Sequence, residues 1–280
     1  MSFKKRLNRI LEPWEQRRIS KSYDVVGDIA IVRIIEATDE EAQKIAKIVL
    51  QSNPHVKTVM QQAGSVEGER RLRRLKWLAG EKKTETVYRE FGCLLKVDLE
   101  KCFFSPRLGF ERMRVANQVR AGEVVVNMFA GVGCFSILIS KHANPLKVYS
   151  VDVNPDAIRF MKENIDLNRV RYIVEAVEGD AKNVIAEKLG KTADRVLMPL
   201  PEKAFEYLDF ALAALKPAGG MVHYYDFSHA KKGVDPVGEV ERKVSEKLKD
   251  SNVAFEYVFG KVVRPVGPRW FQVVLDINVH

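Results

Sequence analysis

The letters VVVNMFAGVG, residues 124–133, decide the fold of this chain. An apolar run typical of a buried strand leads into a loop with two glycines one residue apart, and glycine lets a ligand approach the backbone closely. The next predicted strand ends at Asp152, about twenty residues after the loop, where doubly wound folds place a carboxylate that binds ribose hydroxyls. A third predicted strand ends in Glu178-Gly179-Asp180-Ala181, which places Asp180 to accept from an adenine amino group. The three signals together indicate a nucleotide-type ligand site.

Both aspartates also have a purely structural interpretation. Asp152 and Asp180 each precede a predicted helix, and an aspartate in that position caps the helix by accepting from its first amides. Because the two carboxylates occur in register with the glycine loop, the ligand site is the favoured interpretation.

The pattern after Phe103 alternates between short apolar runs and amphipathic segments, which predicts a mostly parallel sheet with helices on both faces. The fold class is therefore α/β, doubly wound, and we expect this domain to span residues 101–280. The predicted strands are 123–128, 147–153, 171–178, 195–200 and 220–225, with a terminal hairpin of 255–264 and 272–279. The predicted helices are 107–119, 135–141, 155–168 and 201–215.

The preceding residues, 1–100, predict a small α+β domain. Residues 23–35 form two β-rich runs split by Gly27-Asp28, residues 39–50 an amphipathic helix, and residues 56–61 and 88–97 further strands.

Composition points to a polyanionic partner. The chain has 280 residues, a net charge of +9 and a pI of about 9.3. Such an excess is used to displace counterions from phosphates, although a thermophile-like surface rich in Lys, Arg and Glu is the alternative. Clustering favours nucleic acid, and the clustered cations are Arg70, Arg71, Arg73, Arg74 and Lys76, followed by Lys82 and Lys83.

Other functional classes are disfavoured. No apolar run reaches the ~20 residues needed to span a bilayer, and the N-terminus lacks the apolar core of a signal peptide, so we expect a cytoplasmic protein. The three cysteines, Cys93, Cys102 and Cys134, include no Cys-x-x-Cys pair, so neither a disulfide framework nor a metal site is predicted.

Several segments together resemble the archaeal and eukaryotic tRNA (guanine-37) N1-methyltransferases and their wyosine-pathway relatives. The matching segments are Phe129-Ala130-Gly131-Val132-Gly133, Asp152-Val153-Asn154-Pro155-Asp156-Ala157, Phe104-Ser105-Pro106-Arg107-Leu108-Gly109 with Glu111-Arg112, Val66-Glu67-Gly68-Glu69, Thr84-Glu85-Thr86 and His223-Tyr224-Tyr225. The resemblance implies a class I methyltransferase domain behind a small domain, S-adenosylmethionine as cofactor, and the base 3′ of the tRNA anticodon as target. It also implies a monomer that binds the anticodon stem-loop without a metal.

The resemblance assigns roles to individual residues. Glu111 is the implied general base and Arg71 the implied group at the guanine O6. The implied cofactor residues are Phe103, Arg107, Phe129, Ala130, Gly131, Val132, Gly133, Asp152 for the ribose, and Asp180 with Ala181 for the adenine. The implied RNA contacts are Arg70, Arg73, Arg74 and Lys76.

Glu111 and Arg71 also have plainer interpretations. On a continuous helix Glu111 shares a face with Arg107, so the two can address base and cofactor together, or form an ion pair worth only ~0.3–0.5 kcal/mol. Arg71 is either the O6 donor or one more phosphate contact among its neighbours.

The chain also departs from the family pattern. Pro199-Leu200-Pro201 stands where the family usually has Asn-Leu-Pro, and proline supplies neither an amide donor nor a side-chain acceptor. This departure resembles the archaeal branch that also methylates carbon 7 of the tricyclic wyosine precursor, so the target atom stays open. Asn127 replaces a common aspartate, and we expect less shape-selective docking because the sequence begins almost directly at the central domain.

Two other functions are alternatives. One is the aminocarboxypropyltransferase of the same pathway, which transfers the other alkyl group of the same cofactor. The turn after the fourth strand of that enzyme looks different from Pro199-Leu200-Pro201, and the presence of Glu111 favours methylation. The other is a non-catalytic RNA-binding protein that keeps the fold as a scaffold.

Overall fold

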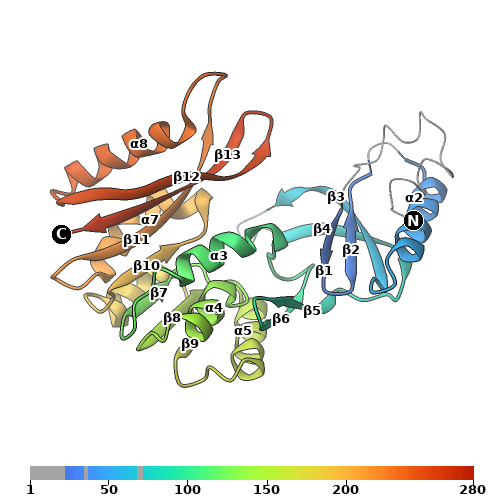
Figure 1. The fold of residues 1–280 in the computed structure, drawn as a ribbon, viewed down its shortest axis with the longest axis horizontal. Coiled ribbons are helices and arrows are strands. Elements are labelled where there is room, and N and C mark those ends of the chain that lie inside the picture. Colours follow the sequence, from blue (N-terminus) through green and yellow to red (C-terminus); the bar gives the residue numbers. More distant parts are fainter. Residues whose placement is uncertain (1–22, 35–36, 68–71) are drawn as a thin grey trace. The chain divides into compact units, whose positions relative to one another are not determined.

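The computed structural model describes residues 23–34, 37–67 and 72–280. The chain divides into two compact units, Met1–Arg107 and Leu108–His280, each built around its own sheet (Figure 1).

The first unit contains a four-stranded sheet in the order β1-β2-β3-β4. Strands β2 and β3 are parallel, and helix α2 is the crossover that connects them. Thr38 begins α2 with a capping box, in which its hydroxyl accepts from Glu41 N at 3.3 Å and Glu41 Oε2 accepts from Thr38 N at 2.7 Å. The apolar side of α2, including Ile45 and Val49, packs on the sheet. The elements are β1 (Asp24–Val26), β2 (Ile29–Val32), α2 (Asp39–Ser52), β3 (Thr58–Glu67) and β4 (Leu72–Gly80).

A hairpin follows, where the sequence predicts one continuous strand over residues 88–97. That prediction is wrong, because β5 (Glu85–Glu90) and β6 (Cys93–Asp98) pair antiparallel. The turn residues Phe91 and Gly92 have φ of 44° and 78°, and two positive φ values in succession match the twist of a tight hairpin.

The second unit contains a seven-stranded sheet in the order β12-β13-β11-β10-β7-β8-β9. Five strands, β7 to β11, are parallel, while β13 runs antiparallel to β11 and to β12. The chain reverses its direction of travel across the sheet between β7 and β10, which is where doubly wound folds bind ligands. The strands are β7 (Val124–Asn127), β8 (Lys147–Asp152), β9 (Val174–Glu178), β10 (Arg195–Met198), β11 (Gly220–His229), β12 (Phe255–Gly267) and β13 (Trp270–Val279). The predicted α/β doubly wound class is confirmed.

Helices cover this sheet. Helices α6, α7 and α8 share one apolar core with β7, β10, β11 and β13, and α4 and α5 contact β8 and β9. The helical elements are η2 (Pro106–Leu108), α3 (Gly109–Ala116), α4 (Cys134–His142), α5 (Pro155–Leu167), α6 (Ala181–Val184), η3 (Ile185–Leu189), α7 (Pro201–Ala214) and α8 (Pro236–Asp250).

Two helices differ from the sequence prediction. The single helix predicted over residues 107–119 is wrong, because a 3-10 turn precedes a short α3. Helix α8 was not predicted. Asp235 caps it by accepting from Val237 N at 3.0 Å and Gly238 N at 3.1 Å, with Pro236 in the first turn.

Among the described residues, no helix has both the length and the apolar character needed to cross a bilayer.

Candidate active site

The glycine loop and the two predicted aspartates lie at the same edge of the second unit's sheet. Strands β7, β8 and β9 are parallel neighbours, so their carboxyl ends lie side by side. Ala130 N donates to Val151 O at 2.9 Å, and Gly179 N donates to Asp152 O at 3.0 Å. The structure therefore brings together the three signals that the sequence places far apart.

The loop after β7 requires glycine for conformation and for space. Gly131 and Gly133 have φ of 55° and 89°, in the left-handed region. A Cβ on Gly133 would lie 2.9 Å from Met161 Cγ. Asn164 Nδ2 donates to Val132 O at 3.0 Å, so buried contacts from α5 hold the loop in place.

Asp152 binds the loop through its side chain. Its Oδ2 accepts from Gly131 N at 2.7 Å, and its Oδ1 accepts from Asn154 N at 2.9 Å. The helix cap of α5 is Asn154 instead, which accepts from Asp156 N at 3.1 Å. The alternative that Asp152 caps the following helix is thus wrong, because its carboxylate orients the glycine loop.

Asp180 does cap its helix, as the structural alternative expects. Its Oδ1 accepts from Lys182 N at 3.0 Å, and both oxygens accept from Tyr207 OH, at 3.0 and 3.1 Å. The Tyr207 ring makes an edge contact with the Phe129 ring, with centroids 5.2 Å apart. Ala181 is buried beside them. Tyr207 is a neighbour of the site that no sequence signal identifies.

These residues fit an adenosine-containing cationic cofactor. The loop offers close backbone approach, and two strand ends offer carboxylates. Beneath the loop, buried Asn127 donates to Ser136 Oγ at 3.1 Å, while its Oδ1 has no hydrogen-bond partner among the described residues. Among all the residues that the structure describes, no three His, Cys, Asp or Glu side chains gather as a metal site would require.

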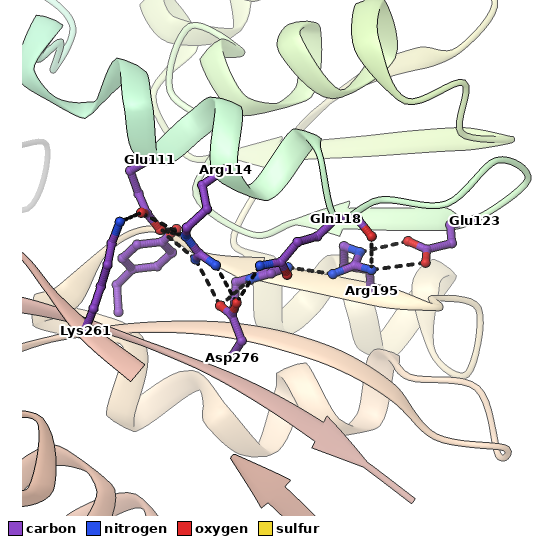
Figure 2. Close-up of polar contacts among 9 residues, drawn as sticks. Glu111, Arg114, Gln118, Glu123, Arg195, Lys261 and Asp276 are labelled. Atoms are coloured by element: carbon purple, nitrogen blue, oxygen red, sulfur yellow. Dashed lines mark hydrogen bonds and ion pairs between the residues drawn. The ribbon is translucent and has the colours of Figure 1, made fainter. Parts of the chain in front are cut away.

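Glu111 is a buried carboxylate, with 3% of its side chain exposed, on helix α3 (Figure 2). Its Oε1 accepts from Arg114 Nη2 at 2.7 Å and from Tyr225 OH at 2.8 Å. Its Oε2 accepts from Arg114 Nε at 3.0 Å and lies 3.2 Å from Lys261 Nζ. Burial raises the pKa of Tyr225 well above its ordinary value, and the nearby Glu111 charge adds to this. Tyr225 is therefore a neutral donor.

Two ring side chains, Phe135 and Tyr225, connect Glu111 to the segment that follows the glycine loop. Phe135, two residues after Gly133, packs against the Tyr225 ring with centroids 6.2 Å apart, and Tyr225 donates to Glu111. Met198, the last residue of β10, pairs with Tyr224, so Tyr225 lies level with the carboxyl end of β10.

The predicted face shared by Glu111 and Arg107 does not form, because Arg107 lies in the 3-10 turn before α3. Arg107 belongs to the first unit, where its Nε donates to Asp24 Oδ1 at 2.8 Å. Phe103 lies in the same unit and is half-buried. Glu111 instead pairs with Arg114, which lies three residues after it, and not with Arg107, which lies four residues before it.

The predicted RNA-contacting cations lie mostly on β4. Arg70 and Arg71 fall outside the described residues. Arg73 is half-buried and donates to Phe104 O at 2.9 Å. Arg74 is exposed, and exposed Lys76 lies 2.6 Å from Asp39.

The proline turn follows β10 directly. Pro199 is half-buried, Leu200 is the residue before α7, and Pro201 occupies the first turn of α7. Proline suits that helical position, since its missing N–H would have no partner there.

Comparison with known proteins places this geometry in a family. The model described as TRM5/TYW2 methyltransferase domain matches residues 86–254, and the TYW2 N-terminal domain matches residues 3–84. The chain belongs to the TRM5/TYW2 methyltransferase family. The family resemblance predicted from the sequence is thereby confirmed.

Relatives cover almost the whole chain. The tRNA (guanine(37)-N(1))-methyltransferase Trm5b of Pyrococcus abyssi is 40% identical over 95% of this chain and 78% of its own length. Its crystal structure matches with a TM-score of 0.85, at 38% identity over 96% of this chain and 78% of the other. The tRNA 4-demethylwyosine(37)-methyltransferase Taw21 of Saccharolobus solfataricus is 39% identical over 95% of this chain and 97% of its own length. Methanocaldococcus jannaschii TYW2, crystallised with AdoMet, has a TM-score of 0.71 at 26% identity, covering 92% and 99% of the two chains.

Proposed function

We propose that this member of the TRM5/TYW2 family transfers the methyl group of S-adenosylmethionine to N1 of guanosine 37 in tRNA. The observation that carries the proposal is the link between the glycine loop and a buried carboxylate. Phe135 follows the loop and packs on Tyr225, and Tyr225 donates to Glu111. The proposed cofactor loop and the proposed proton acceptor are therefore connected by packed side chains, which supports an alkylation that requires deprotonation.

When bound, S-adenosylmethionine supplies an electrophilic methyl group on a sulfonium centre. The Phe129–Gly133 loop and Asp152 would hold its ribose and methionine parts, and Asp180 with Ala181 its adenine. Asp152 would have two roles, because the carboxylate proposed to bind the ribose also fixes the loop by accepting from Gly131 N.

Glu111 would accept the N1 proton as the methyl group bonds to N1, and the bond from the methyl group to the sulfonium sulfur breaks to leave a neutral thioether. Its charge is compensated by Arg114 and Lys261. Arg114 and Tyr225 are largely or fully buried, whereas Lys261 is 40% exposed on β12 and can turn toward solvent. Loss of the Lys261 contact would leave Oε2 with acceptor capacity for a proton from the target base.

A second candidate, carbon 7 of the wyosine precursor, is favoured by Pro199. At the carboxyl end of β10, where ligands bind in such sheets, Pro199 and Pro201 present no side-chain hydrogen-bonding group. Recognition there depends on shape and backbone carbonyls, which accommodates a larger tricyclic base.

We also propose that the first unit binds the anticodon stem-loop, that Arg71 and its basic neighbours contact the RNA, and that the enzyme works as a cytoplasmic monomer. Exposed Arg74 on β4 and the net charge of +9 support the RNA contact.

Mass spectrometry of nucleosides tests the function directly. Protein and S-adenosylmethionine are incubated with one tRNA carrying guanosine at position 37 and another carrying 4-demethylwyosine there. N1-methylguanosine supports the main proposal, and methylation of the tricyclic base alone supports the second candidate. An aminocarboxypropyl adduct, or no product on either tRNA, would refute methyl transfer.

A further inference from the structure

Arg114 joins Glu111 to a second buried carboxylate, Asp276 on β13 (Figure 2). One edge of its guanidinium contacts both oxygens of Glu111, through Nε at 3.0 Å and Nη2 at 2.7 Å. Nη1 and Nη2 donate to the two oxygens of Asp276, the second at 3.0 Å. Because a guanidinium is planar and its donors are fixed, it holds the two carboxylates in one mutual orientation.

Asp276 is fixed from its other side as well. It is completely buried, and it accepts from Gln118 Nε2 at 3.0 Å and from His223 Nδ1 at 2.7 Å. Residues His223 and Asp276 are direct partners across β11 and β13. Burial alone would raise the pKa of Asp276, but hydrogen bonds from His223 and Arg114 outweigh burial and hold this pKa well below its ordinary value.

His223 is neutral and has one defined tautomer. Arg195 Nη1 lies 2.7 Å from His223 Nε2, and a guanidinium can only donate, so Nε2 accepts and Nδ1 carries the proton given to Asp276. Burial lowers the pKa of His223, and Asp276 opposes this shift only in part. Arg195 is paired in turn with Glu123, with Nε to Oε2 at 2.7 Å.

A buried ionic network is weak evidence for a gain in stability. Replacing buried ion pairs with apolar side chains of similar volume is often neutral or stabilising, because desolvating charges is costly. Helix α3, in contrast, needs support from elsewhere, since it has eight residues and no side-chain cap at its N-terminus. The network begins at the carboxylate that the mechanism uses and anchors it to the sheet.

We propose that Arg114 is a positioning residue for the methyl transfer: anchored on Asp276, its guanidinium fixes the orientation of the Glu111 carboxylate toward the target base. Arg114 acts through Glu111 and does not touch the substrate. This inference rests on the proposed function, because it gives Glu111 a partner in its role as base.

Arg114→Lys tests the inference, since lysine keeps the charge but lacks the rigid planar donors that contact both oxygens of each carboxylate. We expect the single-turnover rate at saturating cofactor and tRNA to fall ~10–100-fold. The dissociation constants for cofactor and for tRNA should stay within about twofold of the wild-type values. Asp276→Asn, which weakens the anchor from the other end, should slow the same step. The matched control is Arg242→Lys, because Arg242 pairs with Glu239 at 3.1 Å with the same i,i+3 spacing on the outer face of α8. All rates are measured well below each variant's melting temperature.

A double variant separates positioning from a general structural effect. If Arg114 acts through Glu111, Glu111→Gln with Arg114→Lys turns over no more slowly than Glu111→Gln alone. Equal slowing by Arg114→Lys with and without Glu111 would overturn the inference, and so would wild-type turnover of Arg114→Lys. Failure of the proposed function is recognised separately, because the wild-type protein would then yield no methylated nucleoside.

Discussion

Replacing Glu111 with Gln is the most informative single change, because the structure separates its chemical effect from its structural one. Gln keeps the volume and one acceptor, so Arg114 Nη2 and Tyr225 OH keep their contacts at Oε1. At the Oε2 position the new amide would donate toward Arg114 Nε and Lys261 Nζ, which are themselves donors.

The structural cost is limited by the surroundings of Glu111. Lys261 is 40% exposed and can turn into water, and Arg114 keeps Asp276 as a counterion. We therefore expect a loss of about 1–3 kcal/mol in the free energy of unfolding, typical of one lost charged hydrogen-bonding arrangement.

The chemical cost is expected to be larger. Loss of the proton acceptor should reduce kcat for N1 methylation by ~10²–10⁴, which corresponds to ~2.7–5.5 kcal/mol of transition-state stabilisation. Affinities for cofactor and tRNA should barely change. The assay is a single-turnover measurement at saturating cofactor, with Glu239→Gln on the outer face of α8 as the matched control. Near-normal turnover of Glu111→Gln across pH 6–9 would show that Glu111 is not the base.

Three further predictions concern other parts of the chain. Asp152→Ala should weaken S-adenosylmethionine binding by ~10²-fold or more, because it removes charged acceptors and frees Gly131 N; an unchanged dissociation constant in isothermal titration would contradict the ribose assignment. Affinity for tRNA should fall steeply with salt if residues 70–83 displace counterions, and Arg74→Gln should make the slope of log affinity against log salt shallower by about one. His223→Gln keeps a donor for Asp276 and an acceptor for Arg195, but no longer titrates. His223 faces Asp276, Arg195 and Arg114, and burial lowers its pKa in the folded protein. The unfolded chain therefore binds the extra proton, and stability falls as pH drops below ~6.5. The urea unfolding midpoint should therefore fall less between pH 7.5 and pH 5 in His223→Gln than in the wild-type protein. Equal shifts in the two proteins would exclude this contribution of His223.

The sequence predicts the cofactor half of the site because that half is encoded locally. Each strand carries the residues proposed to bind the cofactor at its own carboxyl end, and parallel pairing then brings Gly131, Asp152 and Asp180 together. The fold class follows from the same alternation of strands and helices. Helix α8 was not predicted because its buried positions, Val240, Val244 and Leu248, form a narrow apolar stripe in a highly charged segment. The hairpin turn was not predicted because one of its two residues is Phe91, and a bulky residue such as Phe rarely adopts a positive φ.

Two of the carboxylates with proposed roles in the second unit, Asp152 and Glu111, are held in opposite ways. Asp152 is oriented by backbone amides of residues close to it in the fold, one of them only two positions along the chain. Glu111 is oriented by Arg114, whose anchor Asp276 lies 162 positions away in sequence, and His223 supports that anchor across 53 positions. No local pattern can reveal such partners, since they meet only when β13 has joined the sheet beside β11. The cofactor loop thus depends on local conformation, whereas the orientation of the proposed base depends on completion of the whole sheet. Variants that weaken β13 pairing should therefore reduce turnover more than they reduce cofactor affinity.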